Sequence, residues 1–212
     1  MTKTNRISYN ANCVSECVLV EEAVMRTGLD TNVVICRAAQ IANEVGIDNI
    51  TLKMLADDLG VKSPSLYNHI EGLEDLKNQL MIYGWKQMEQ KIMQSVIGIS
   101  GYDAIKAGCY SFYEYATENP GVFNAMLWYN KFQNSETIEA TSGLFSILFK
   151  VTSSLNISDE NCNHIIRTLR GFLEGFSLLV NNKAFGNPIS IEESFELSLN
   201  VLIEGIKTLE EK

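Results

Sequence analysis

The sequence predicts an all-α protein in which a small N-terminal helical bundle is joined by a long helix to a larger helical region. Two observations predict this fold: apolar residues recur at helical spacing from Asp30 onward, and no segment alternates apolar and polar residues as a strand does. With 212 residues, 46% of them hydrophobic, the chain is long enough to bury a substantial core. We expect a poorly ordered or short-helical leader at 1–28, a first domain at 29–75 and a second domain at 76–212.

Two short helices are predicted directly after the leader. Apolar residues at helical spacing between Val34 and Val45 indicate the first helix, and Gly46 ends it, as a glycine after the last turn commonly does. Thr51 has the hydroxyl group that an N-cap residue uses, so we expect the second helix to begin after it and to end at Gly60.

A third helix is predicted to begin at Ser63, because Pro64 suits the first turn of a helix, and to extend to Ile70. Ala56 is small where the second and third helices must approach closely, and Gly60 permits a positive φ in the turn between them. This spacing is typical of a helix-turn-helix, whose second helix can enter the major groove of DNA.

Polar residues of this segment are candidates for contact with DNA. Short hydrogen-bonding side chains at the start of a recognition helix read base edges, and flanking polar or cationic groups bind phosphate. The candidates for base contact are Ser63, Ser65 and Asn68, and those for phosphate contact are Thr51, Lys53, Lys62, Tyr67 and His69.

The charge balance opposes an extensive nucleic-acid groove. The chain has a formal net charge of −9, and its residues 30–80 contain four basic and eight acidic side chains, a balance of −4. Nonspecific DNA affinity comes mainly from phosphate neutralisation by Lys and Arg. DNA binding by this chain must therefore depend on the placement of a few groups.

The stretch Leu-Gly-Val-x-x-Pro-Ser-Leu-Tyr-x-His at 59–69 resembles the DNA-binding domain of TetR-family transcriptional regulators. A helix ending in Gly46 and an Ile50-Thr51 pair precede it, and the similarity covers about residues 30–80. The resemblance implies a helix-turn-helix DNA-binding domain at 29–75 and a ligand-binding and dimerisation domain at 76–212.

The same resemblance implies roles for individual residues. It implies that Thr51, Tyr67 and His69 contact phosphates, and that the residues facing bases are Ser63, Pro64, Ser65 and Asn68. Many family members have a lysine at the start of the next helix, where this chain departs from them with Glu71-Gly-Leu-Glu-Asp75.

A long amphipathic helix is predicted from Leu73 to about Val96, and the glycines at 98 and 101 end it. Turn signals at Asn119-Pro120-Gly121 and Gly186-Asn187-Pro188 separate some of the helices that follow. Those helices are expected at 102–118, 121–131, 136–154, 159–183 and 191–210.

The last two helices carry wide apolar stripes, and Gly171 and Gly175 would let another helix approach closely. Two such helices from each of two subunits form a four-helix interface, although the stripes would equally complete the core of one chain. The segments 169–179, 202–206 and 110–128 resemble one TetR subgroup, whose C-terminal helices dimerise. The candidate interface residues are Ile165, Leu169, Phe172, Phe176, Phe195, Leu199, Leu202 and Ile206.

Aromatic residues are frequent between 85 and 150, and an apolar, aromatic-lined cavity is the usual form of a small-molecule site. Aromatic residues at helical spacing are otherwise ordinary core. The candidate ligand-pocket residues are Trp85, Tyr110, Tyr113, Phe123, Trp128, Phe149 and Leu169.

Other chemistry finds little support in the sequence. The two histidines, His69 and His164, have no Ser/His/Asp or metal-ligand spacing around them, so we expect no metal and no cofactor. Five isolated cysteines do not describe a disulfide framework, although Cys13 and Cys17, four residues apart, could form a redox or metal pair. No run of ~20 apolar residues and no secretory signal is present, which predicts a cytoplasmic protein without a membrane partner.

These features together predict a homodimeric repressor that binds double-stranded operator DNA sequence-specifically and is released by a small hydrophobic effector. The chain is predicted not to be an enzyme. Two alternatives stay open: a helical protein-binding adaptor without DNA binding, with which the acidic balance is compatible, and an all-helical enzyme acting on a small molecule.

Overall fold

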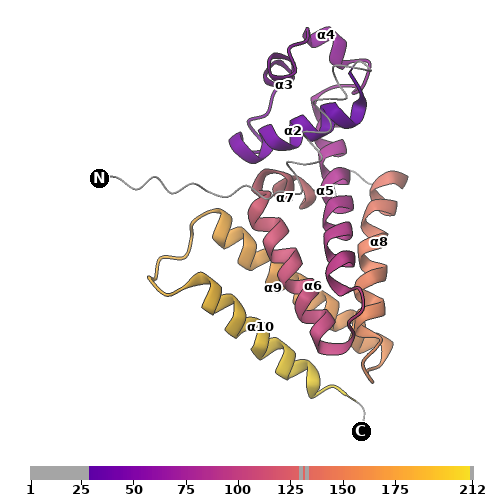
Figure 1. Cartoon of the computed structure of the whole chain (residues 1–212), viewed down its shortest axis with the longest axis vertical. Helices are drawn as coiled ribbons and strands as arrows, with labels where there is room; N and C mark the ends of the chain where they lie inside the picture. Colours follow the sequence, from indigo (N-terminus) through magenta and orange to yellow (C-terminus); the bar gives the residue numbers. More distant parts are fainter. Residues whose placement is uncertain (1–28, 129–130, 132–133, 211–212) are drawn as a thin grey trace. The chain divides into compact units, whose positions relative to one another are not determined.

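A computed structural model of the chain describes residues 29–128, 131 and 134–210 (Figure 1). Every regular element in these ranges is a helix, which confirms the predicted all-α fold. The chain divides into two compact units, one ending at Leu80 and the other beginning at Met81. The predicted leader, with Cys13 and Cys17, lies outside the described residues.

The N-terminal unit contains three short helices and the start of a long one. They are α2 (Thr31–Val45), α3 (Leu52–Asp58), α4 (Ser63–Leu66) and the first turns of α5 (Leu73–Val96). Helix α3 contacts both α2 and α4. Their order is that of the predicted helix-turn-helix.

The ends of these helices follow the predicted signals. The carboxylate of Asp30 accepts a hydrogen bond from the Asn32 amide at 3.2 Å, and Gly46, with φ of 85°, ends α2. The Thr51 hydroxyl caps α3 by accepting the Met54 amide at 3.2 Å. Gly60 has φ of 65° in the turn after α3, a conformation that a side chain would strain.

Helix α4 is shorter than predicted. It begins at Ser63 but ends at Leu66, and turns follow up to His69, so Ile70 is not part of the helix. Pro64 lies in its first turn, while Lys62 occupies the N-cap position and provides no side-chain hydrogen bond. A helix of four residues has little stability of its own, so tertiary packing must hold it in place.

Buried apolar residues and one ion pair hold this unit together. Leu55 and Leu66 have no exposed surface, and Ala56 is only 1% exposed between them. The guanidinium of Arg37 on α2 donates two hydrogen bonds of 2.8 Å to the Asp58 carboxylate at the end of α3. Because the pair is bidentate, it fixes the orientation of α3 on α2 more tightly than a single contact would.

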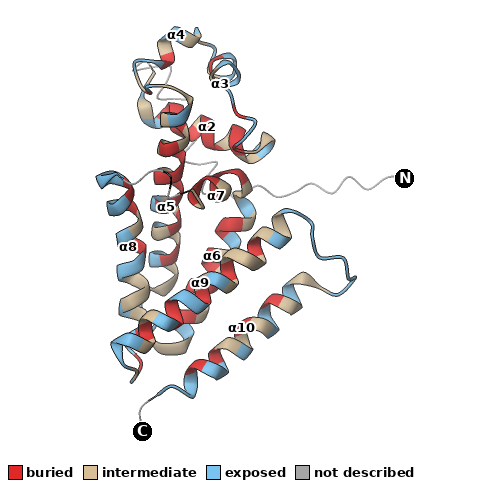
Figure 2. Cartoon of the chain, turned by 180° about the vertical axis from the view of Figure 1, so that it is seen from behind, coloured by how far each residue is buried: buried red, intermediate tan, exposed pale blue. Residues whose placement is uncertain are grey.

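The C-terminal unit contains the rest of α5 and the helices that follow it (Figure 1). Helix α9 contacts α6, α8 and α10, while α6 also contacts α7 and α8. Figure 2 shows exposed residues along α8 and α10 as well as the buried residues that face their neighbours. These helices are α6 (Gly101–Glu118), α7 (Pro120–Met126), α8 (Ser135–Thr152), α9 (Asp159–Asn181) and α10 (Ile191–Lys207).

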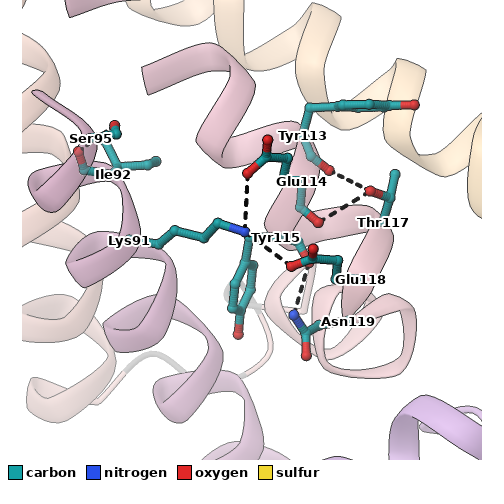
Figure 3. Close-up of polar contacts among 9 residues, drawn as sticks. All are labelled: Lys91, Ile92, Ser95, Tyr113, Glu114, Tyr115, Thr117, Glu118 and Asn119. Atoms are coloured by element: carbon teal, nitrogen blue, oxygen red, sulfur yellow. Dashed lines mark hydrogen bonds and ion pairs between the residues drawn. The ribbon is translucent and has the colours of Figure 1, made fainter. Parts of the chain in front are cut away.

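Two local features fix α5 within this unit. A Cβ atom at Gly84 would lie 2.7 Å from side-chain atoms of Val122 and Met126, so α5 and α7 approach as closely as they do because residue 84 is glycine. Farther along α5, the Lys91 ammonium group lies 3.4 Å from the Glu114 carboxylate and 3.0 Å from that of Glu118 on α6 (Figure 3).

The predicted helix boundaries hold within a few residues, with one larger difference. The helix predicted at 121–131 is α7, which ends at Met126 because the chain turns at Leu127 and Trp128. No helix in the described ranges is both long enough and apolar enough to span a membrane.

The neighbours Leu66 and Tyr67 provide a test of this packing. Leu66→Ala should lower the free energy of unfolding by about 2–5 kcal/mol, because it removes a fully buried side chain. Tyr67→Ala should change it by less than about 1 kcal/mol, because the Tyr67 side chain is 58% exposed. Urea unfolding of the full chain, followed by circular dichroism, measures both; equal losses would contradict the assigned orientation of α4.

Candidate functional site

The segment 51–69 presents polar side chains around a buried anchor. None of the nine residues predicted to contact DNA is buried: Ser63, Ser65 and His69 are half-buried and the others are exposed. Leu66, in the middle of the segment, is fully buried. These side chains are therefore accessible to a partner, while burial of Leu66 packs the segment against the rest of the N-terminal unit.

The Thr51 hydroxyl caps α3 and can also donate a hydrogen bond to a partner. Its oxygen accepts the Met54 amide as the cap of α3, and the residue is exposed. A hydroxyl has one donor in addition to its acceptor lone pairs, so the Thr51 hydroxyl proton remains available to an anionic oxygen.

The cations of this unit differ in how they are paired. Arg37, which sequence reasoning did not single out, is paired with Asp58. Lys53 and Lys62 are exposed and have no ion-pair partner among the described residues. Within segment 51–69, these two lysines are the side chains that can neutralise phosphate.

His69 is held by a residue that the sequence analysis missed. The Thr31 hydroxyl, at the start of α2, lies 3.1 Å from the Nδ1 atom of His69. When Nδ1 accepts this hydrogen bond, the ring proton is on Nε2, which makes Nε2 a donor. The available signal for Thr31 was its hydroxyl group at the first position of α2, where the side chain is half-buried and can bond to a residue distant in sequence.

The C-terminal unit contains a cavity of about 460 Å³ bounded by α5, α6, α8 and α9. Its volume lies within the range of about 300–1,000 Å³ found for small-molecule sites. Trp85 and Leu169 line it, as predicted for a ligand pocket. Cys109 also lines it, and burial raises the pKa of this thiol to about 12, so it is uncharged at neutral pH and a poor nucleophile.

Five other predicted pocket residues lie outside the lining of this cavity. Tyr110 and Tyr113 face α10, where their rings lie 5.4 and 4.2 Å from that of Phe195. Phe123 is buried against Phe112, with ring centroids 5.9 Å apart. The remaining two are Phe149, which stacks on Phe145, and Trp128, whose ring lies under the Lys131 ammonium group.

Sequence reasoning also missed part of the lining. Helix α8 contributes Ile138, Thr141 and Phe145, which share one helix face, and α9 contributes Arg167 and Arg170. Polar residues within an apolar helical stripe were the available signal, since they interrupt a face that would otherwise be ordinary core.

The predicted dimer residues mostly belong to the core of a single chain. Ile165, Leu169, Phe195, Leu199 and Ile206 are all less than 9% exposed, and Phe172, Phe176 and Leu202 are half-buried. Their apolar stripes complete the monomer core, so the five buried side chains are not available to a partner without rearrangement.

Other residues of α9 and α10 remain open on the surface. Leu197 and Val201 on α10 are 66% and 63% exposed. Gly171 and Gly175 on α9 have open space where a Cβ atom would lie. Because these residues are apolar or lack a side chain, they are better candidates for an interface than the residues predicted.

No group of three or more potential metal ligands was found among the described residues. Of the cysteines in that part of the chain, Cys36, Cys109 and Cys162 are buried and in the thiol form, outside any disulfide.

Comparison with known proteins relates the chain to transcriptional regulators and its C-terminal half to one family model. Residues 105–202 match the family model described as the Tetracyclin repressor-like C-terminal domain. The chain is 29% identical over 182 residues to YobS, an HTH-type transcriptional regulator of Bacillus subtilis (strain 168), covering 85% of this chain and 94% of that protein. It is also 43% identical over 54 residues to the class A tetracycline repressor from transposon 1721 of Escherichia coli, covering 26% of this chain and 25% of the repressor.

Solved structures share the fold. The crystal structure of a TetR protein from Acinetobacter baumannii AYE in complex with minocycline superposes with a TM-score of 0.67 at 18% identity, covering 87% of this chain and 99% of that one. At this identity the likeness concerns the fold alone. Fold, family match and curated relatives agree: the chain resembles TetR-family proteins and is a helix-turn-helix, DNA-binding transcriptional regulator, not an enzyme.

Proposed function

We propose that this regulator is a homodimeric cytoplasmic repressor. Residues 51–69 of each protomer bind one half-site of a double-stranded operator, and a small hydrophobic effector in the cavity of the C-terminal unit releases the DNA. The observation that carries the DNA-binding site is the exposure of its polar residues around the buried side chain of Leu66.

The polar groups of the segment suit a duplex. Lys53 and Lys62 supply unpaired positive charge, while the Thr51 hydroxyl supplies a donor to phosphate. The Nε2 atom of His69 adds another donor when Thr31 donates to Nδ1. Ser63, Pro64, Ser65 and Asn68 remain for contact with bases in the major groove.

Effector control is supported by the cavity and by α5. This helix begins in the N-terminal unit and contributes Trp85, Ile92 and Val96 to the cavity lining. The related fold from A. baumannii was solved with minocycline, which supports a small-molecule site in this chain without identifying its ligand. An effector that binds one position of α5 better than another shifts the population toward that position and so changes DNA affinity.

The double variant Tyr67→Ala with His69→Ala tests the DNA-binding site. Its affinity for an operator selected from random DNA should fall by about 100-fold, because two hydrogen bonds to charged oxygens are lost. Mobility shifts with excess competitor DNA measure the loss. Tyr102→Ala, a tyrosine change in the C-terminal unit, is the control and should bind normally; unchanged binding by the double variant would contradict the assignment.

Lys62→Gln tests the electrostatic part of the interface. The slope of log K against log salt concentration should become shallower by about 0.9, the amount expected for one lost phosphate contact. Fluorescence anisotropy with labelled operator at several salt concentrations measures this slope. Lys106→Gln on α6 should leave it unchanged; a wild-type protein without any salt dependence would instead support the adaptor alternative.

Leu197→Glu with Val201→Glu tests the dimer. Because both side chains project from α10 into solvent in the single chain, the double variant should fold but fail to dimerise. Light scattering after size-exclusion chromatography at micromolar concentration should give the mass of one chain. Ile97→Glu, at a position 72% exposed, should remain dimeric; a dimeric double variant would place the interface elsewhere.

A further inference from the structure

We propose that the effector is an amphipathic anion, with an apolar body that fills the cavity of the C-terminal unit and a negatively charged head group held by Arg167 and Arg170. This inference rests on the proposed function, because it takes the cavity as the effector site. It goes beyond that function in assigning the charge and shape of the ligand.

The charge of the cavity lining is opposite to that of the whole chain. The chain has 26 acidic and 17 basic residues. The lining residues include Arg167 and Arg170, both on α9, and no aspartate or glutamate. The lining residues of this cavity therefore carry positive charge only, although Arg170 is paired with Glu174 and the Glu89 carboxylate lies against Gly143, beside the lining.

The hydroxyl groups of the lining do not compete with the arginines as donors. The Thr141 hydroxyl donates to the Thr137 carbonyl at 3.0 Å, and the Ser142 hydroxyl donates to the Glu139 carbonyl at 2.9 Å. The Thr152 hydroxyl likewise donates to its own helix at 3.0 Å. Since each hydroxyl has one donor, these groups offer a ligand only acceptors.

The neutral nitrogen and sulfur donors of the lining are also poorly placed. The indole nitrogen of Trp85 has no hydrogen-bond partner in the described part of the chain, but other atoms cover it completely. The Cys109 thiol is buried and is a weak donor. The guanidinium groups therefore remain as the strong donors that an acceptor on the ligand can reach.

The two arginines are placed differently. Arg170 donates from Nε to the Glu174 carboxylate at 2.6 Å, and its Cζ atom lies 5.7 Å from the centre of the Trp85 ring. Arg167 is exposed and has no ion-pair or hydrogen-bond partner among the described residues. Arg167 is therefore the guanidinium that can form a new bidentate pair without breaking an existing one.

Exposure separates the mouth of the cavity from its floor. Ile138 and Phe145 on α8 are 63% and 47% exposed, and Arg167 on α9 is exposed as well, so this side opens to solvent. Leu169 and Leu173, farther along α9, are buried. A ligand that fits both the mouth and the floor places its charged group at the mouth beside Arg167, because desolvation of a charge costs least there. Its apolar part is buried on the floor of the cavity.

The test compares probes of one chain length and different head groups. Calorimetric titration of the full-length dimer with decanoate, decyl sulfate and decanol, all below micelle formation, should show at least one anion binding about tenfold more tightly than the alcohol. The tighter anion identifies the head group. Decanol binding as tightly as both anions would overturn the proposal.

Variants assign this preference to the arginine. Arg167→Gln should weaken anion binding about tenfold and leave decanol binding unchanged, while Arg167→Lys, which keeps the charge, should retain part of the preference. Lys183→Gln, a charge loss in the loop after α9, should change neither. An anion preference that survives Arg167→Gln, or an equal loss for anion and alcohol, would contradict the role of Arg167.

The same samples separate this inference from the proposed function. Operator binding by the ligand-free protein is measured first, so its absence would remove the DNA-binding proposal whatever the titrations give. The protein could instead bind operator while neither anion weakens that binding and the titrations show no preference for an anion. That result would contradict only the inference about the effector.

Discussion

Burial of Leu66 is the interaction on which the DNA-binding segment depends. Helix α4 has four residues, too few to persist without tertiary contacts, and it has no side-chain N-cap. Its position comes from Leu66 in the core and from α3, which the Arg37–Asp58 pair orients on α2. The exposed residues on either side of Leu66 contribute little to folding. Stability therefore does not restrict which side chains stand there, and contact with DNA can determine them.

The Arg37–Asp58 pair has a second consequence, for electrostatics. It uses the one arginine in the described part of the N-terminal unit, which is already acidic, so attraction of that part to DNA rests on a few lysines and on hydrogen-bond donors. Weak general attraction lowers binding to nonspecific DNA. Discrimination then depends on the fit of hydrogen bonds from short side chains at one sequence, since a broad basic surface would bind every sequence similarly.

Local signals allowed most of the N-terminal unit to be predicted from sequence. The Thr51 cap and the glycines at 46 and 60 act within a few residues, and the structure has each of them as expected. The lining of the cavity was harder to predict, because the spacing of aromatic residues shows that a helix has a buried face but not which neighbouring helix covers that face. Tyr113, for example, packs on Phe195 of α10 while Phe112, next to it, lines the cavity. The dimer residues stay a prediction: five of them are buried in the single chain, because an apolar stripe on α10 also marks the face toward its own core.

Helix α9 connects the two functions proposed for the C-terminal unit. Leu169, Arg170 and Leu173 line the cavity, while Gly171 and Gly175 leave the surface of the same helix open to a second copy. A helix is stiff over such a short length, so a ligand that shifts α9 moves its cavity-facing side and the surface at the glycines together. In the proposed dimer, that movement changes how two protomers meet, and with it the spacing of their recognition segments. In the proposed mechanism, effector binding therefore reaches the DNA by two routes, through α5 within one protomer and through α9 between protomers, and both begin at residues that line one cavity.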